Sequence, residues 1–396
     1  MDLPQKCTGC MACYNSCKYN AIEIVQNYKG FYIPKINSKI CKQCGICKIN
    51  CPEINAIKAN RWKECFAAWS KNELIRKSST SGGVFYEIAA SILKDSGIIY
   101  GVLFDYKENK VYHGSIDKLE DLKLMQGSKY VQSYVGDIFS NVKKNLENNK
   151  TVLFSGVACQ IAGLKKYLGK DFSNLITVDV LCHGVPSPKI FNDYLVEKNI
   201  KNINKINFRY KKPSWTVFSM NIEYDNKKYN MNTNKDEYLR LFLSDYITND
   251  ICSECKYIGE NRVSDITLAD FWGYISENKK YRNTEKGISL VLLNSEVGKN
   301  IFANIKDNIC FIEKDFIEAK TGNRCLTKPY EKNKEYIDFW NDYKEFGYVY
   351  CKEKYYKQKK MPIKRKLSLF INDNAYILPK PIRKTIYKLK HKKKGV

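Results

Sequence analysis

One feature constrains this chain more than any other: a cysteine spacing that occurs twice near its beginning. Eight cysteines follow the pattern Cys-x-x-Cys-x-x-Cys-x-x-x-Cys in two runs, which are Cys7, Cys10, Cys13 and Cys17, then Cys41, Cys44, Cys47 and Cys51. An Asn-Ala-Ile triplet follows each run, at 20–22 and at 55–57. The repeat predicts two copies of one small strand-and-helix unit around a pseudo-twofold axis, with 31–36 as a strand between them.

The spacing is typical of a module that holds two [4Fe–4S] clusters. Each Cys-x-x-Cys-x-x-Cys loop supplies three thiolates to one cluster, and the fourth cysteine of each run ligates the other cluster. The expected ligand sets are Cys7, Cys10, Cys13 and Cys51 for cluster 1, and Cys41, Cys44, Cys47 and Cys17 for cluster 2. Pro52 follows Cys51 as this pattern requires, whereas Lys18 replaces the matching proline after Cys17. Two zinc sites, which also take four cysteines, are the less favoured alternative.

Length and composition indicate a chain of two or three packed domains, because it has 396 residues of which 44% are apolar. No apolar run approaches the roughly 18 residues of a membrane-spanning helix, and the N-terminal stretch is not of signal-peptide type. We therefore expect a cytoplasmic protein whose cysteines serve metal or redox chemistry. Four cysteines outside the motifs are expected to be buried packing residues: Cys65, Cys310, Cys325 and Cys351.

Beyond the cysteine repeat, apolar patterns predict alternating strands and helices. The expected strands are 65–69, 98–104, 151–154, 175–181 and 288–293; the expected helices are 84–93, 142–146, 159–168 and 298–305; a hairpin is expected over 218–231. This order predicts an α+β dicluster ferredoxin module, then a larger α/β domain with a mixed or mostly parallel sheet, then a basic tail. The expected boundaries are 1–58, 59–350 (with sub-parts of about 62–145 and 146–325) and 351–396.

Four further cysteines stand in contexts that suggest another metal site. Cys159 and Cys182 directly follow predicted strands, where α/β sheets place their ligands. Cys252 and Cys255 form a Cys-x-x-Cys pair. Taken alone, such a pair is as often a zinc site or a dithiol, and cysteines at strand ends are usually buried packing residues.

From about residue 62 to 325 the chain resembles the beta subunit of coenzyme F420 hydrogenase/dehydrogenase, a family that includes flavin-dependent relatives such as 7-hydroxymethyl chlorophyll a reductase. The matching stretches are 79–83, 127–133, the segments around Cys159 and Cys182, 207–209, the pair Cys252 and Cys255, and 265–273. The resemblance implies FAD and a third [4Fe–4S] centre in the large domain. It implies cluster ligands at Cys159, Cys182, Cys252 and Cys255, and flavin contacts near Ser81, Gly82, Gly83 and Lys129.

The residues themselves allow this flavin site without a standard dinucleotide fingerprint, since no Gly-x-Gly-x-x-Gly is present. Ser81, Gly82 and Gly83 open a predicted helix, whose N-terminal N–H groups suit a pyrophosphate. The alternative is a serine cap with glycines for close packing. His183 is the candidate proton donor near the flavin, with a hydrogen-bonded structural histidine as the favoured alternative. Asp270 is either a flavin or substrate contact or a buried turn cap.

The segment 351–396 is strongly basic, with sixteen Lys or Arg against two acidic residues. A solvated surface is the simplest interpretation. The sharper one is adhesion to an anionic membrane at its inner face. Nucleic acid is disfavoured as a partner because no base-reading motif is present.

Together these features predict an iron–sulfur flavoprotein oxidoreductase. It would pass electrons between its [4Fe–4S] clusters and FAD, and then to or from an organic hydride acceptor. The acceptor would be the deazaflavin coenzyme F420 or another substrate, with surface polysaccharide biosynthesis as one setting. The expected protein partner is a low-potential electron donor or acceptor. The alternative is an electron-relay subunit without a substrate of its own, which docks to a partner enzyme.

Overall fold

The computed structural model describes residues 3–4, 6–60, 64–212, 215–274 and 286–356, together with residues 379 and 381. Most of the predicted basic tail lies outside these residues. Cys351 and Tyr355 are buried, so the packed body continues past the boundary expected at residue 350. Within the described ranges, every helix is too short or too polar to cross a bilayer.

The N-terminal module has the repeated build that the cysteine runs predict. Strands β1 (Ile22–Gln26) and β2 (Tyr32–Ile36) pair antiparallel. Each cysteine run contains one short helix, α1 (Ala12–Asn15) or α2 (Ile46–Ile49), and each helix follows a residue with positive φ. The strand expected at 31–36 and the dicluster fold are therefore confirmed.

The larger domain is built on one eight-stranded sheet with the order β13-β3-β12-β11-β7-β6-β4-β5. Its strands are β3 (Glu64–Ser70), β4 (Ile98–Asp105), β5 (Lys110–Ile116), β6 (Val152–Val157), β7 (Leu175–Val180), β11 (Ile266–Asp270), β12 (Ser289–Leu293) and β13 (Ile309–Glu313). The four strands β11, β7, β6 and β4 run parallel, and the pairs on either side are antiparallel. The mixed sheet that the sequence predicts is confirmed, and strands from both expected sub-parts share it.

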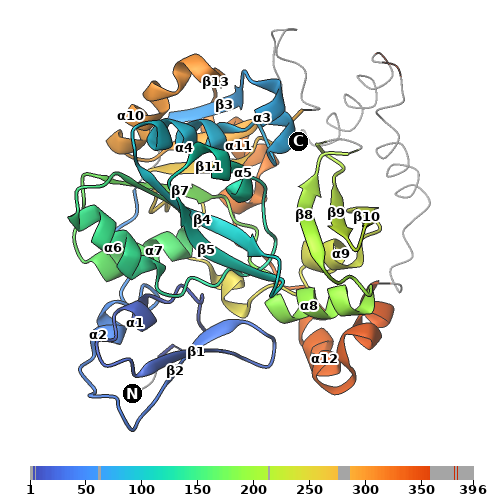
Figure 1. Cartoon of the computed structure of the whole chain (residues 1–396). Helices are drawn as coiled ribbons and strands as arrows, with labels where there is room; N and C mark the ends of the chain where they lie inside the picture. Colours follow the sequence, from blue (N-terminus) through green and yellow to red (C-terminus); the bar gives the residue numbers. More distant parts are fainter. Residues whose placement is uncertain are drawn as a thin grey trace.

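Helices cover both faces of this sheet (Figure 1). They are α3 (Glu73–Ser78), α4 (Val84–Lys94), α5 (Leu122–Met125), α6 (Ile138–Glu147), α7 (Ala158–Leu168), α10 (Glu296–Asn304) and α11 (Phe316–Gly322). Successive residues of β6 point to opposite faces. Leu153 packs in the core with α4 and α10, whereas Val152 and Phe154 pack in the core with α6 and α7.

A second sheet stands apart from the first. Strands β8 (Ile203–Tyr210), β9 (Ser219–Tyr224) and β10 (Lys227–Asn232) are antiparallel. The turn between β9 and β10 contains Asp225 at φ 45° and Asn226 at φ 57°, as a two-residue hairpin turn requires. The predicted hairpin is confirmed.

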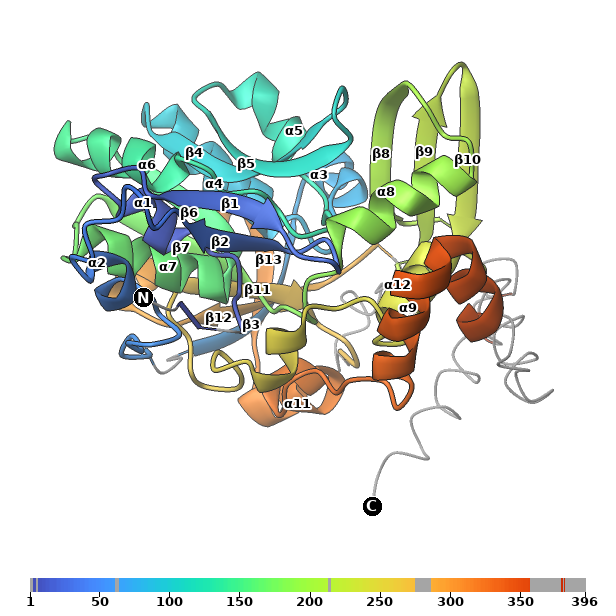
Figure 2. The ribbon, with the colours of Figure 1, turned by 90° about the horizontal axis from the view of Figure 1, so that it is seen from below.

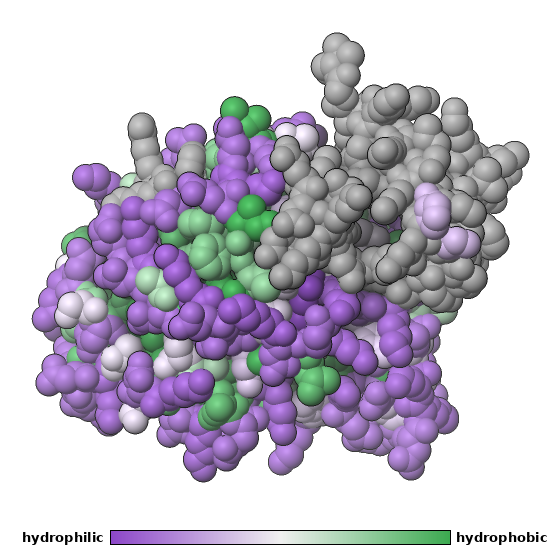
Figure 3. Space-filling view, turned by 90° about the horizontal axis from the view of Figure 1, so that it is seen from above, coloured by the Kyte–Doolittle hydropathy of each residue, from purple (hydrophilic) through white to green (hydrophobic). Residues whose placement is uncertain are grey.

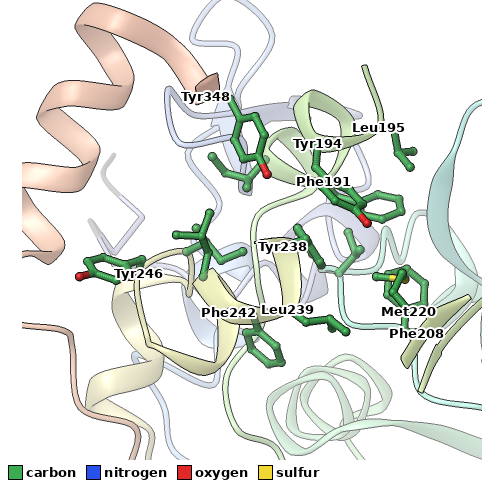
Figure 4. Close-up of a cluster of buried hydrophobic side chains, with 14 of the residues drawn as sticks. Phe191, Tyr194, Leu195, Phe208, Met220, Tyr238, Leu239, Phe242, Tyr246 and Tyr348 are labelled. Atoms are coloured by element: carbon green, nitrogen blue, oxygen red, sulfur yellow. The ribbon is translucent and has the colours of Figure 1, made fainter. Parts of the chain in front are cut away.

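This second sheet has its own aromatic core (Figure 4). The core includes residues of α8 (Pro188–Glu197), α9 (Glu237–Leu243) and α12 (Tyr336–Cys351). The labelled side chains Phe191, Tyr194 and Tyr238 are fully buried and lie close together. The core fixes β8 and the segment after α9 beside the large sheet, which matters for the sites described below.

The N-terminal module packs against α6 and α7 of the larger domain, as the two ribbon views show (Figures 1 and 2). On the opposite side of the molecule, the described surface is mainly hydrophilic with apolar residues scattered between (Figure 3). The face of the large domain formed by α6 and α7 is therefore covered by the module, and the face seen in Figure 3 is exposed to solvent.

Candidate functional site

The first predicted cysteine set lines one hollow that is partly open to solvent. Cys7, Cys10 and Cys13 from the first run and Cys51 from the second run all line it. Burial raises the pKa of Cys7 to about 12 and that of Cys10 to about 11. Buried thiols of this kind favour a cationic centre, because binding it replaces their protons. Cys51 of the second run therefore lies beside the three cysteines of the first run, as the expected ligand set requires.

The second set lies on the outer side of the module. Cys47 is buried beside Cys17 and Cys13 in a small apolar cluster with Ile22. Burial, with the nearby Cys44 and Cys17, raises the pKa of Cys47. Cys44 is exposed and Cys41 is half-buried. The structure thus places Cys17 of the first run with the second run, as the ligand assignment requires.

The third set lines a second, larger hollow, which is also partly open to solvent. Cys159 lies in the first turn of α7, Cys182 follows β7, and Cys252 and Cys255 lie in and after the turn 250–254. Burial raises the pKa of Cys252 to about 12 and raises the pKa values of the other three thiols. Four thiols that are distant in sequence therefore face one space.

The spacing of the thiols within each set is wide. Among the described residues, no three His, Cys, Asp or Glu side chains are grouped closely enough to hold one metal ion. A zinc ion sits about 2.3 Å from each thiolate and needs a tighter group of thiols than a cluster does. In the first and third sets, four cysteines line one hollow.

The three sets form a row. Cys13 of the first set packs against Cys17 and Cys47 of the second. Thr8 and Glu53 line both the first and the third hollow. Helix α7, which carries Cys159, also lies against the first set: a Cβ on its Gly163 would be 2.9 Å from Cys10 Sγ. The order in space is therefore second, first, third.

Two polar side chains that the sequence reasoning missed hold the module in place beside this row. Gln132 Oε1 accepts a hydrogen bond from Tyr32 N at 2.8 Å, and its Nε2 donates to Thr8 O at 3.2 Å. Asn249 Nδ2 donates to Cys7 O at 3.2 Å. Gln132 lies in the stretch 127–133 that carried the resemblance, but only the fold shows what it contacts.

The predicted flavin stretch around Ser81 lies where α4 begins. Ser81 Oγ donates to Ile288 O at 2.7 Å and does not cap the helix. Gly82 lies against neighbouring strands, since a Cβ there would come within 2.4 Å of Ala68 O. Gly83 precedes α4 at φ 93° without a side-chain cap. Close packing therefore explains Gly82, and the helix start retains uncapped N–H groups.

The two predicted flavin stretches meet in space. Ser128 N donates to Thr80 Oγ1 at 2.8 Å, and Gln126 Nε2 donates to Ser79 Oγ at 3.2 Å. Lys129 Nζ donates to Leu124 O in α5 and to Gln126 O, and burial lowers the pKa of Lys129 to about 7. Lys129 thus lies on a loop that is hydrogen-bonded to the segment carrying Ser81, Gly82 and Gly83.

Two further cations lie beside this junction, and the sequence reasoning missed both. Lys211 Nζ donates to Ser81 O at 2.9 Å and to Lys286 O at 2.7 Å, and burial lowers its pKa to about 7. Arg209 is 5% exposed and pairs with Asp270. Within the described ranges, Arg209 Nε and Nη2 have no hydrogen-bond partner. The stretches 207–209 and 265–273 marked this region, but not these contacts.

Asp270 and Arg209 are held in an aromatic frame. Trp215 Nε1 donates to Asp270 Oδ1 at 2.7 Å, and the Trp215 and Trp272 rings stack with centroids 4.6 Å apart. The Arg209 guanidinium lies over Phe218 and Trp272, at 4.7 and 5.0 Å from the ring centroids. Planar groups and a fixed cation together suit an anionic, aromatic ligand.

His183, the candidate proton donor, is bound by neighbouring side chains. Its Nε2 is 3.2 Å from Asp245 Oδ1, and its Nδ1 is 3.9 Å from Cys325 Sγ. The hydrogen bond with Asp245 raises the pKa of His183 to about 9. Both ring nitrogens of His183 thus face neighbouring side chains, and its role as a proton donor stays a prediction.

Comparisons with known proteins give a match for the N-terminal module and another for much of the large domain. Residues 149–319 match the family described as the C terminus of the coenzyme F420 hydrogenase/dehydrogenase beta subunit, and residues 6–55 match a 4Fe-4S dicluster domain. Over 50 residues, 13% of this chain, the sequence is 40% identical to the ferredoxin-type protein NapF of Escherichia coli (strain K12), and equally to that of Escherichia coli O157:H7. The chain spans 30% of the length of these relatives.

A solved structure also resembles the fold. It is the F420-reducing [NiFe] hydrogenase complex from Methanosarcina barkeri, matched over 77% of this chain and 95% of that chain, with a TM-score of 0.45 and 16% identity.

Proposed function

We propose that the chain is an iron–sulfur flavoprotein oxidoreductase with three [4Fe–4S] centres and FAD, because residues 149–319 match the coenzyme F420 hydrogenase/dehydrogenase beta subunit family and residues 6–55 match a 4Fe-4S dicluster domain. The family supports an electron-transfer oxidoreductase. The row of three cysteine sets is the observation that supports three centres and a path toward a flavin. The row links the module to the large domain, because the first and third hollows share lining residues.

The cysteines and the basic residues have separate parts in this proposal. Cys159, Cys182, Cys252 and Cys255 would hold the third centre, and Lys129, Lys211 and Arg209 would face the anionic parts of the flavin. When bound, the clusters would supply one-electron transfer and FAD would exchange single electrons for a hydride. Gln132 and Asn249 would keep the first cysteine set against the third by holding Thr8 and Cys7.

The positions of Lys129 and Lys211 also fit the charge of a flavin dinucleotide. Lys129 and Lys211 each have a pKa lowered to about 7 by burial, so a pyrophosphate would restore the charge that burial disfavours. Arg209 contributes a fixed cation between aromatic rings. The organic hydride acceptor would be coenzyme F420 or another small molecule, and a sugar-linked substrate of surface polysaccharide biosynthesis is one such class.

Two measurements test this proposal: the amount of flavin bound per chain, and the reduction of an organic acceptor by the reduced protein. The chain is purified and reconstituted without oxygen, its bound flavin is quantified, and the dithionite-reduced protein is offered deazaflavin, nicotinamide and sugar-nucleotide acceptors. We expect about one FAD per chain and reduction of one acceptor class. A folded preparation with full iron content and no flavin would instead establish an electron-relay subunit.

A further inference from the structure

The second cysteine set reaches the surface of the module. Cys44 is exposed, whereas Cys10 and Cys13 of the first set are buried. Helix α2, which follows Cys44, lies at the outer edge of the module in both ribbon views (Figures 1 and 2). Electron transfer between proteins requires such an approach of one centre to the surface, so the rim around Cys44 is the relevant docking area.

This rim is basic and contains no acidic residue. Its lysines are Lys18, Lys39, Lys42 and Lys48, of which the first three are exposed. The segments 16–20 and 37–50 contain no Asp or Glu. Within the described part of the chain, none of the four lysines forms an ion pair. Their charges therefore face solvent without internal compensation.

The two segments form one continuous surface. Asn50 Nδ2 donates to Ser16 Oγ at 2.9 Å, and Asn37 N donates to Ala21 O at 2.8 Å. These bonds bring the turn that carries Lys18 beside the loop that carries the other three lysines. The replacement of the expected proline by Lys18 thus adds a charge to the same rim.

Large apolar side chains lie among these lysines. Tyr19 is 48% exposed, Ile40 is 44% exposed and Ile49 is 63% exposed. A group of exposed apolar side chains with charges around it is the usual composition of a transient protein–protein interface. The apolar residues would supply contact area, and the lysines would supply orientation and a fast approach.

We propose that the rim formed by residues 16–20 and 37–50 is the docking surface for a small acidic one-electron carrier protein, an inference that rests on the proposed function. Charge complementarity selects an acidic partner. Membranes and nucleic acids are also anionic, but the exposure of Cys44 on the same rim as the lysines is explained by a redox protein that must approach this cysteine set.

Binding of a purified acidic 2[4Fe–4S] ferredoxin to the anaerobically reconstituted full chain tests this proposal. The charge-reversal variant carries K18E, K39E, K42E and K48E. A matched control reverses four exposed lysines on the large domain: K94E, K118E, K123E and K205E. A second variant, I40S with I49S, removes apolar contacts and keeps every charge.

At low ionic strength we expect the charge-reversal variant to bind the ferredoxin at least about tenfold more weakly, and the matched control to bind as the parent does. The difference shrinks as salt is added. The I40S and I49S variant weakens binding without changing its dependence on salt. Cytochrome c, a basic electron carrier, is used as a comparison. We expect it to bind the charge-reversal variant at least as tightly as it binds the parent and the other variants.

Several results would overturn the docking surface. One is an unchanged dissociation constant for the charge-reversal variant with iron and sulfide intact, and another is an equal loss in the matched control. A third is binding of anionic vesicles or duplex DNA, but not ferredoxin, through the four lysines. Flavin is quantified in the same samples: its absence with ferredoxin binding retained refutes the proposed function alone, and its presence without binding refutes the docking surface alone.

Discussion

At the scale of single residues, two lysines on the segments around Ser81 have an electrostatic imbalance that an anionic ligand would correct. Among the described residues, the partners of the Lys129 and Lys211 ammonium groups are carbonyl groups, and burial lowers the pKa of each lysine to about 7. Each lysine is therefore about half neutral at pH 7 in the free protein. An anion nearby favours the charged form and raises the pKa.

This imbalance makes a prediction about pH. Anion binding would be linked to proton uptake by Lys129, so the dissociation constant of FAD should fall as pH is lowered from 9 through about 7 and level off below that. K129M should weaken binding and reduce the slope of log Kd against pH by up to about one. Fluorescence titration of the flavin at several pH values measures both.

The matched control for this prediction is K129R, because arginine remains charged throughout this range. It should lose the same part of the pH dependence while it retains more affinity than K129M. Identical pH slopes in the parent, K129M and K129R would show that Lys129 does not face the flavin.

At the scale of secondary-structure elements, the start of α4 depends on a close backbone approach. A Cβ on Gly82 would lie 2.4 Å from Ala68 O in β3 and 2.8 Å from Ser289 N in β12. Backbone atoms of two sheet strands have no room to move apart. The glycine therefore sets the distance between the loop 79–83 and the sheet, and with it the position of the uncapped helix start.

We predict that G82A destabilises the holoprotein by roughly 2 kcal/mol or more, because overpacking against backbone cannot relax. G169A is the comparison. Gly169 has φ 70°, and a Cβ added there would have no atom within 4 Å, so its cost is only the left-handed conformation, about 1 kcal/mol. Thermal unfolding should give the lower Tm for G82A. A G82A protein as stable as the parent would contradict this packing argument.

Elements with strong local signals were predictable from the sequence. The apolar stripe at 84–93 corresponds to α4, and Asp225-Asn226 corresponds to the β9–β10 turn, because both signals depend on neighbouring residues alone. The separation of β8, β9 and β10 into a second sheet was not predictable, since periodicity does not say which strands pair.

The same distinction applies to the sites. The first two cysteine sets were predictable because cluster ligation imposes a spacing on the chain. The third set was expected only from the family resemblance, since its cysteines have no such spacing. The contacts of Arg209 with Asp270 and of Lys211 with Ser81 depend on long-range folding. The stretches 207–209 and 265–273 carried a family resemblance, but nothing in their local sequence indicated these contacts.

At the scale of the whole molecule, the module is fixed to the large domain at several separate points. Lys29 Nζ is 2.7 Å from Asp250 Oδ2 and lies over the rings of Tyr336 and Trp340. Gln132 and Asn249 bind the loop of the first cysteine set. These contacts tie the module to the large domain within one chain, beside the loops that carry the first and third cysteine sets.

The most direct test of this row is the iron and acid-labile sulfide content of the anaerobically reconstituted full chain, with zinc measured in the same samples. Three centres predict about twelve irons and twelve sulfides per chain, and about eight of each in the double variant C159S/C252S. A folded parent protein that contains zinc in place of iron, or that has the same iron content as C159S/C252S, would contradict the account.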